Sequence, residues 1–317
     1  MNRRSFVKNS SILSLGALTT PTEWMSNAGL LKNVGLGLFS IPKMLDTDLN
    51  AAFSMLNKMG YTEVELFGPY TFSTEKARKS WEGAAKQLGF NGSGLFGKST
   101  DELKKITKSY GISIPSMHTD LDTLSNNIGP LLDAANALGS KYVVLPAIPD
   151  ENRKTLDDYK KTAALFNKIG ADANKEGIRF AYHNHGYGLQ AKDGIMPLDI
   201  IFNETDPSLV YFEMDLYWTM AAGADPIQLL NKHKGRYTMM HVKDMKESKK
   251  FAGDGGDMMQ WMALFPFMTS AGEGVFDLPA ILKAAKDNGM KHFFVEQDLV
   301  AQPELALKKS IDYLKTL

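Results

Sequence analysis

Four short segments of this chain carry imidazole, carboxylate and ammonium groups directly after apolar runs. They read AYHNH at residues 181–185, EMD at 213–215, HVKD at 241–244 and VEQD at 295–298. Each follows β-branched or aromatic residues, which is typical of a barrel strand that delivers its last side chains to a shared mouth. Four strand ends that meet there can bind one divalent metal ion.

The composition limits the classes of protein to which this chain can belong. Its 317 residues are 44% hydrophobic and 23% charged, which is enough for one large α/β barrel or two ordinary domains. The 36 basic and 36 acidic residues balance, so we expect no nucleic acid partner. The chain has no cysteine, which excludes disulfides and thiolate metal sites.

The first thirty residues differ from the rest of the chain. Arg3 and Arg4 are followed by Phe6, Lys8 and a mild apolar run at 12–18, a pattern that resembles a twin-arginine export signal. The run is too short to span a bilayer, so we expect no membrane span in the mature protein. The sequence thus predicts a signal at 1–30, a single domain at 31–317 and a periplasmic location. A disordered basic N-terminus is the alternative.

From residue 34 onward, short apolar runs alternate with amphipathic segments. The predicted strands are 34–39, 62–67, 112–117, 142–145, 179–183, 210–214, 237–242 and 293–295. The predicted helices are 49–59, 75–88, 100–110, 156–175, 197–202, 225–232, 278–288 and 303–317. This alternation predicts an α/β fold, the (β/α)8 TIM barrel, in one domain. The long segment 245–276, rich in Gly, Met, Phe and Trp, is a candidate lid.

These segments together resemble the xylose-isomerase-like sugar phosphate isomerase/epimerase family. The likeness covers residues 34–317 and includes YHNH at 182–185, MDLYW at 214–218, MHVKD at 240–244, GEGVFD at 272–277 and VEQD at 295–298. The resemblance implies a divalent metal, often manganese, at the carboxyl ends of strands five to eight. Transferred to this sequence, its ligands are His183, Asp215, His241 and Glu296. Zinc, cobalt, iron and magnesium are the alternatives to manganese.

The strand-five position departs from the pattern of the epimerase members. They have a glutamate where this sequence has His183, and they use a pair of glutamates to move protons on opposite faces of the sugar. Two imidazoles and two carboxylates form a mixed site that suits transition metals better than calcium. A symmetric mechanism with two glutamates is therefore in doubt for this chain.

The alternation of side chains along a strand adds candidates for the same mouth. His185 shares a face with His183, Lys243 with His241, Glu213 with Asp215 and Asp298 with Glu296. We expect Lys243 to stabilise negative charge on an enolate oxygen and His185 to move a proton or bind a hydroxyl group.

Four further residues are candidates for contact with a substrate: His118, Glu65, Trp218 and Glu213. His118 ends the third predicted strand and Glu65 lies near the end of the second. Trp218 offers an apolar face for a sugar ring or belongs to the core. Glu65 binds a hydroxyl group or caps a helix.

The predicted reaction is proton abstraction next to a sugar carbonyl, with Glu296 as the base and an enediolate intermediate. Return of the proton gives an isomerase or epimerase, whereas loss of a β-substituent gives a keto-glycoside lyase or hydrolase. The expected partner is a small sugar or keto-sugar, unphosphorylated if the protein is exported, and a homo-oligomer is possible. An apurinic endonuclease would need more metal ligands and a basic groove. A non-catalytic exported sugar-binding protein is the remote alternative.

Overall fold

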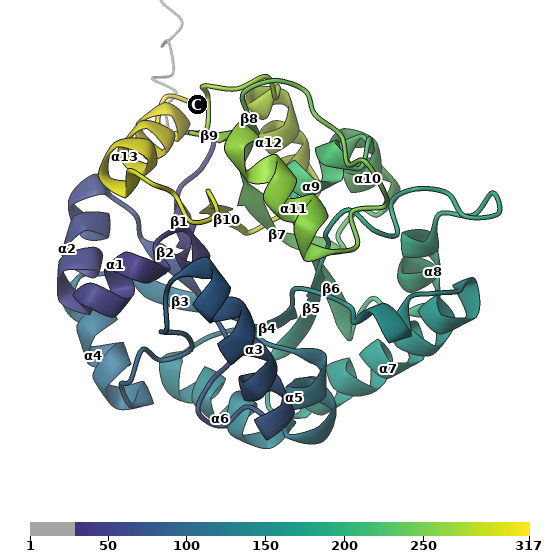
Figure 1. Cartoon of the computed structure of the whole chain (residues 1–317), viewed down its shortest axis with the longest axis horizontal. Coiled ribbons are helices and arrows are strands. Elements are labelled where there is room, and N and C mark those ends of the chain that lie inside the picture. Colours follow the sequence, from purple (N-terminus) through teal and green to yellow (C-terminus); the bar gives the residue numbers. More distant parts are fainter. Residues whose placement is uncertain (1–28) are drawn as a thin grey trace, which may run out of the picture.

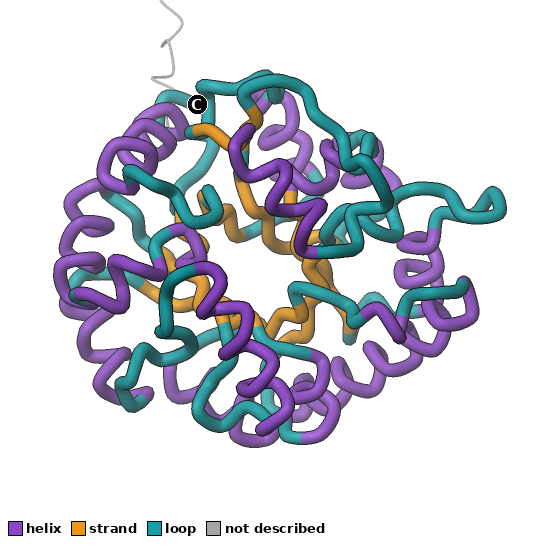
Figure 2. Tube along the Cα trace, in the orientation of Figure 1, coloured by secondary structure: helices purple, strands orange, loops and turns teal. Residues whose placement is uncertain are grey.

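The computed structural model describes residues 29–317, in which eight parallel strands close into a barrel surrounded by helices (Figure 1, Figure 2). The order round the barrel is β1, β2, β3, β4, β5, β6, β7 and β10, which pairs with β1 again. These strands are β1 (Gly35–Gly37), β2 (Glu63–Phe67), β3 (Ser113–His118), β4 (Tyr142–Leu145), β5 (Arg179–His183), β6 (Val210–Asp215), β7 (Tyr237–Val242) and β10 (His292–Val295). The predicted TIM barrel is confirmed. The predicted export signal at 1–30 lies almost entirely outside the described residues, so its boundary with the domain stays a prediction.

Helices connect the strands on the outside of the barrel, and each predicted helix is present. They are α1 (Pro42–Thr47), α2 (Leu49–Met59), α3 (Glu75–Leu88), α4 (Thr100–Ser109), α5 (Leu121–Asn126), α6 (Ile128–Leu138), α7 (Leu156–Lys175), α8 (Pro197–Glu204), α9 (Leu216–Ala221), α10 (Pro226–Lys232), α11 (Met258–Leu264), α12 (Leu278–Asp287) and α13 (Pro303–Leu314). Within residues 29–317, no helix combines the length and the apolar character that a membrane crossing requires.

The pairing of helices with strands differs from the prediction at one point. The sequence pattern predicts no helix between the third and fourth strands, but α5 and α6 lie there. Gly129 and Pro130 obscured α6, because both residues normally interrupt a helix. They occupy its first turn, where the backbone N–H that proline lacks would have no helical partner. The predicted 75–88 helix, α3, is instead an additional helix between β2 and α4.

Local sequence signals explain where several elements begin and end. Thr155 and Asp158 form a reciprocal capping box at the start of α7. The Asp48 carboxylate accepts a hydrogen bond from the backbone of Ala51 at the start of α2, and Gly60, with φ of 97°, ends that helix. These caps set the lengths of helices whose apolar faces then pack on the barrel.

The interior of the barrel is filled by a separate apolar cluster below the polar strand ends. Its buried members are Tyr142, Val144, Ala181, Met239 and Phe294. They lie on the same strand faces as the candidate site residues, usually two positions earlier, because side chains alternate along a strand. The cluster therefore forms a solid floor on which the polar groups of the mouth rest.

The long segment after β7 has structure of its own. β8 (Asp244–Met245) pairs antiparallel with β9 (Met268–Thr269), and α11 and a 3-10 helix (Phe265–Phe267) lie between them. The Asp244 carboxylate accepts hydrogen bonds from the backbone N–H groups of Gly272, Gly274 and Phe276 at 3.0, 3.0 and 3.2 Å. This holds both ends of the segment at the barrel mouth; that the segment acts as a lid stays a prediction.

Candidate active site

The polar residues singled out in the sequence meet at the carboxyl ends of the strands. The barrel register sets His183 beside Glu213 on neighbouring strands, and Asp215 beside His241. A cavity of about 560 Å³ opens above them, and its floor includes His118, His183, His241, Lys243 and Glu296. Glu65, His185, Trp218 and Asp298 also line this cavity. Residues at the carboxyl ends of six of the eight barrel strands are thus brought together by the closed barrel.

Two buried glutamates orient the two predicted histidine ligands. His183 uses Nδ1 to contact Glu213 Oε2 at 2.9 Å, and His241 uses Nε2 to contact Glu65 Oε2 at 2.5 Å. If each of these nitrogens carries the proton, then His183 Nε2 and His241 Nδ1 keep a lone pair. A carboxylate behind each imidazole is the usual way in which proteins orient histidine ligands of a metal.

Asp215 is held by one oxygen while the other faces the site. Its Oδ1 accepts a hydrogen bond of 2.9 Å from the backbone of Trp218 and so caps α9. Oδ2 lies 3.5 Å from His183 Nε2 and 3.9 Å from His241 Nδ1. Lys243 Nζ is 3.0 Å from Oδ2, but the angles do not make a hydrogen bond, and this buried oxygen has no hydrogen-bond partner. A buried carboxylate oxygen without a hydrogen bond calls for an explanation, and an ion bound at this oxygen would supply one.

Glu296 completes the predicted set. Its Oε2 lies 2.7 Å from His241 Nδ1 and 2.8 Å from Lys243 Nζ. Its other oxygen packs against the backbone of β1, where a Cβ on Gly37 would come within 2.5 Å of Oε1. Glycine at position 37 therefore leaves the space that the carboxylate occupies.

The donor set fits a divalent cation. Asp215, His241 and Glu296 can each offer a ligand atom within 4.8 Å of the others. Three carboxylates, those of Asp215, Glu296 and Asp298, lie within 3.0 Å of the ammonium group of Lys243. The nitrogen and oxygen donors of the group favour manganese, iron, cobalt or zinc.

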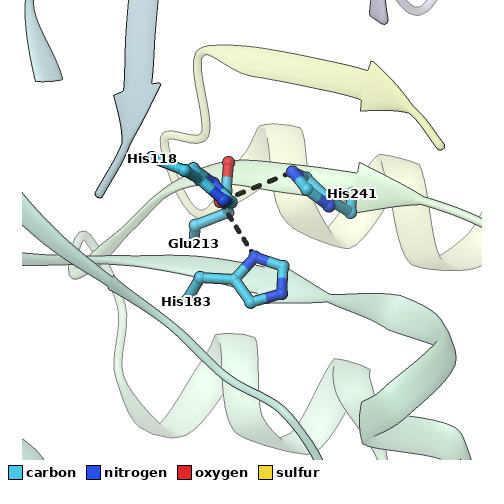
Figure 3. A group of neighbouring side chains, drawn as sticks. All are labelled: His118, His183, Glu213 and His241. Carbon is cyan, nitrogen blue, oxygen red and sulfur yellow. Dashed lines mark hydrogen bonds and ion pairs between the residues drawn. The ribbon is translucent and has the colours of Figure 1, made fainter. Parts of the chain in front are cut away.

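A second group of side chains could also hold an ion. His118, His183, Glu213 and His241 offer ligand atoms that also lie within 4.8 Å of one another, and Figure 3 shows Glu213 with the three histidines around it. This group, and not the first, contains the predicted ligand His183, and its Glu213 Oε2 lies 2.8 Å from His118 and 2.9 Å from His183. We interpret Glu213 as the hydrogen-bond partner that orients His183, whose Nε2 lies 3.5 Å from Asp215 Oδ2 in the first group.

Lys243 is a buried ammonium held by three carboxylates. Nζ lies 2.9 Å from Asp298 in addition to its contacts with Asp215 and Glu296. Burial acts against its charge, but these carboxylates outweigh burial and raise the pKa of Lys243 well above its usual value. Burial is also the main reason why the pKa of Asp298 rises to about 7. Lys243 is thus a fixed positive charge at the cavity surface.

His118 is a second positive group of the cluster. Its Nε2 lies 2.9 Å from Glu65 and 2.8 Å from Glu213. Burial opposes its protonation, but the two carboxylates outweigh burial and raise the pKa of His118 to about 9. Glu213 itself is completely buried, does not line the cavity, and has a pKa raised to about 7, mainly by burial and then by Glu65. The geometry therefore favours Glu213 as a partner of imidazoles over the predicted substrate contact.

His185 faces the cavity in a fixed orientation. Its Nδ1 lies 2.8 Å from the carbonyl oxygen of Pro146, so Nδ1 donates and Nε2 remains an acceptor. Burial, followed by the charge of Lys243, lowers the pKa of His185 to about 3. Its ring stacks on Trp218 at 6.0 Å, and Trp218 is itself 2% exposed. Trp218 thus serves the core and lines the cavity at the same time.

Several residues of the site were not recognised in the sequence. The hydroxyl group of Ser116 donates a hydrogen bond to Glu65, and Gly37 packs on Glu296. Trp81 and Trp261 line the cavity from helices outside the barrel. The two glycines of β1 were a usable signal for Gly37, because a glycine inside a strand often marks close contact. The tryptophans gave no such signal.

Gly37→Ala is expected to reduce metal affinity and activity together, because the new Cβ would push the Glu296 carboxylate out of its place. A loss of about tenfold or more is expected, comparable to the effect of changing a residue that supports a metal ligand. Gly129→Ala, where a Cβ would meet nothing within 4 Å, is the control. Titration of the metal-free protein with manganese measures the effect; equal affinities of the two variants would contradict it.

Metal affinity is expected to increase with pH. Burial disfavours the charged form of His241, but Glu296, Glu213 and Glu65 outweigh burial and raise its pKa well above the usual value. An ion must then displace this proton, so affinity should increase by about tenfold per pH unit from about pH 6 to pH 8 for one proton released. Competition with a chelating dye measures this, and an affinity that is constant over that range would count against the ligand role of His241.

The barrel and its buried polar mouth define the class of protein. The profile of the xylose isomerase-like TIM barrel family matches residues 53–317. This match covers most of the chain, and the chain belongs to that family.

Several known proteins are similar to this chain over part or most of its length. An inosose dehydratase from Clostridium perfringens is 28% identical over 203 residues, which are 58% of this chain and 67% of that protein. Among solved structures, a sugar phosphate isomerase/epimerase from Parabacteroides distasonis has a TM-score of 0.67 at 23% identity, covering 89% of this chain and 93% of that one. An IolI protein with a bound zinc atom has a TM-score of 0.63 at 16% identity, covering 90% and 95%. At these identities the solved structures support the fold alone.

Proposed function

We propose that this chain is a divalent-metal-dependent lyase that removes a β-substituent from a cyclic keto-sugar or keto-polyol. The observation that carries the proposal is the convergence of Asp215, His241 and Glu296 beside the buried ammonium of Lys243. The name of the inosose dehydratases describes an elimination of water, which supports a lyase over the isomerase that the sequence first suggested.

The base in this proposal is Glu296, which takes the proton from the carbon next to the carbonyl group. Its carboxylate lines the cavity, and it stays ionised at neutral pH. Burial acts in the opposite direction, but His241 and Lys243 hold the pKa of Glu296 well below its usual range. Lys243 then donates hydrogen bonds to the oxygen that gains negative charge.

The acid in this proposal is His118. Its imidazolium lines the cavity and, with a pKa of about 9, keeps its proton at neutral pH. As the bond from the β-carbon to the leaving oxygen breaks, the electron pair stays on that oxygen and the His118 proton is transferred to it. The products are water or an alcohol and an unsaturated ketone or its tautomer.

A divalent ion held by His183, Asp215, His241 and Glu296 would polarise the carbonyl group and stabilise the negative charge by several kcal/mol. We propose manganese as the metal because the family resemblance implies it. The donor atoms suit zinc, cobalt and iron equally well.

Isomerisation or epimerisation of a keto-sugar is the second candidate, because it begins with the same proton abstraction. The solved isomerase/epimerase with the same fold leaves this reading open. The imidazole of His183 at the strand-five position argues against it, since it removes the second glutamate of a symmetric mechanism.

The product formed in heavy water separates these readings. The metal-loaded enzyme is incubated with inosose and a panel of cyclic keto-sugars, and the products are followed by proton NMR. The proposal predicts loss of one substituent and a new unsaturated or tautomerised product, which disappears after chelation of the metal. Deuterium at the α-carbon with every substituent retained would instead establish an isomerase. Binding without any reaction would favour the non-catalytic sugar-binding protein.

Export is a separate part of the proposal, because Arg3 and Arg4 lie outside the described residues. Replacement of both arginines by lysine is expected to keep the protein in the cytoplasm with its signal uncleaved. Fractionation of cells that express the two forms measures this. Unchanged export would show that the segment is not a twin-arginine signal.

A further inference from the structure

The helix α3 turns an apolar stripe toward the cavity. Ala77, Trp81, Ala84 and Leu88 are spaced as one face of a helix, and all four line the cavity. Of the residues in α3, a helix that the structure describes in full, only Ala85 is buried. Trp81 packs on Phe39, Phe67 and Phe90, with ring centroids 5.9 to 6.4 Å apart, so the barrel covers this face of α3 in part and the cavity takes the remainder.

The helix α11 has the same property on the other side of the mouth, and Figure 1 shows the two helices on opposite sides of the opening. Met258, Trp261 and Met262 line the cavity at helical spacing, and Leu264 is the one residue buried within this fully described helix. The indole N–H of Trp261 donates a 2.7 Å hydrogen bond to the carbonyl of Gly255, which holds the ring in place. Arg153 holds the adjacent Gly256 carbonyl at 2.5 Å.

The cavity thus has a polar floor and mixed walls. The floor carries the charged groups described above, while the apolar stripes of α3 and α11 line the walls together with Lys76, Asp120, Asp122 and Glu151. A dry cavity of about 150 Å³ holds one benzene ring. The volume of about 560 Å³ therefore has room for a sugar-sized ring on the floor and a second ring between the helices.

We propose that the natural substrate is a keto-glycoside whose sugar ring occupies the floor and whose planar, uncharged aglycone lies between Trp81 and Trp261. This rests on the proposed function for the sugar part, and it adds the class of the attached group. Flat aromatic rings stack favourably on indole and remove the exposed apolar surface of both helices from water. Free inosose or a free keto-sugar would leave the two stripes uncovered.

Binding of unreactive glycosides tests this without turnover. The metal-loaded full chain is titrated by calorimetry with a panel of paired phenyl and methyl hexopyranosides and with phenol. At least one phenyl glycoside is expected to bind about tenfold or more tightly than its methyl partner and than phenol. Equal affinity within every pair, including no binding by either, would overturn the proposal, as would phenol binding as tightly as the phenyl glycosides.

Variants of the two tryptophans test which side chains cause the preference for phenyl over methyl glycosides. Trp261→Ala is expected to abolish this preference, and Trp81→Ala is a second variant in case the first is unstable. Met259→Ala is the matched control, because Met259 lies on α11, is 74% exposed and does not line the cavity. A preference that survives both tryptophan changes would also overturn the proposal. Failure of elimination with an intact phenyl preference would instead count against the proposed function alone.

Discussion

Asp215→Asn is expected to remove the bound divalent ion and all measurable activity while the barrel remains folded. Oδ1 of Asp215 caps α9, and Oδ2 is the oxygen that faces the site. An asparagine that keeps the cap turns an NH₂ group toward the ion, and an amide nitrogen does not bind it. Changes to residues behind metal ligands already cost about 10–100-fold in affinity, so the loss of a ligand should cost at least 100-fold. Alanine at His241 should have the same effect.

Asp225→Asn is the control for this change. Asp225 caps α10 through Ile227 and Gln228 in the same way, but it does not belong to either group of candidate ligands. Metal content after purification, with thermal unfolding of both variants, measures the effect. Full metal content in Asp215→Asn would remove Asp215 from the ligand set.

Glu296→Gln is expected to separate metal binding from catalysis. The amide keeps one oxygen that can bind the ion but cannot accept a proton, so most of the metal should remain while kcat falls by about 100-fold or more. Glu273→Gln is the control, because Glu273 is a partly exposed residue whose partner is Lys309, at 2.6 Å. If Glu296→Gln is almost fully active, then Glu296 is a ligand only. The base would then have to be His185 or His118.

The sequence predicted the fold and the location of the site because both depend on local patterns. Apolar runs that end in polar residues identify barrel strands, and alternation identifies their inward faces. This brought His183, His241, Lys243 and Glu296 correctly to one cavity. Their chemical roles remain predictions.

Alternation predicts the face of a side chain but not its depth. Glu213 and Asp215 share a face of β6, and both are completely buried and do not line the cavity, so the predicted contact of Glu213 with a substrate is not favoured. The positions of α3 and α11 over the mouth depend on the three-dimensional path of the connections. The contribution of Trp81 and Trp261 to the cavity therefore required the structure.

Few residues distinguish elimination from isomerisation, whereas the whole barrel determines the fold. Both reactions begin with the same base and the same charge stabilisation, so Glu296 and Lys243 do not distinguish them. The difference lies in the residue that handles the second proton. His118, which Glu65 and Glu213 keep protonated, is suited to protonate a leaving group, and this supports the lyase.

We propose that His183, Asp215, His241 and Glu296 hold one divalent ion. Anomalous diffraction from crystals soaked with manganese would locate such an ion. One strong peak is expected within about 2.0–2.3 Å of His183 Nε2, Asp215 Oδ2, His241 Nδ1 and a Glu296 oxygen. A peak among His118, His183, Glu213 and His241 instead, or no peak at the barrel mouth, would contradict it.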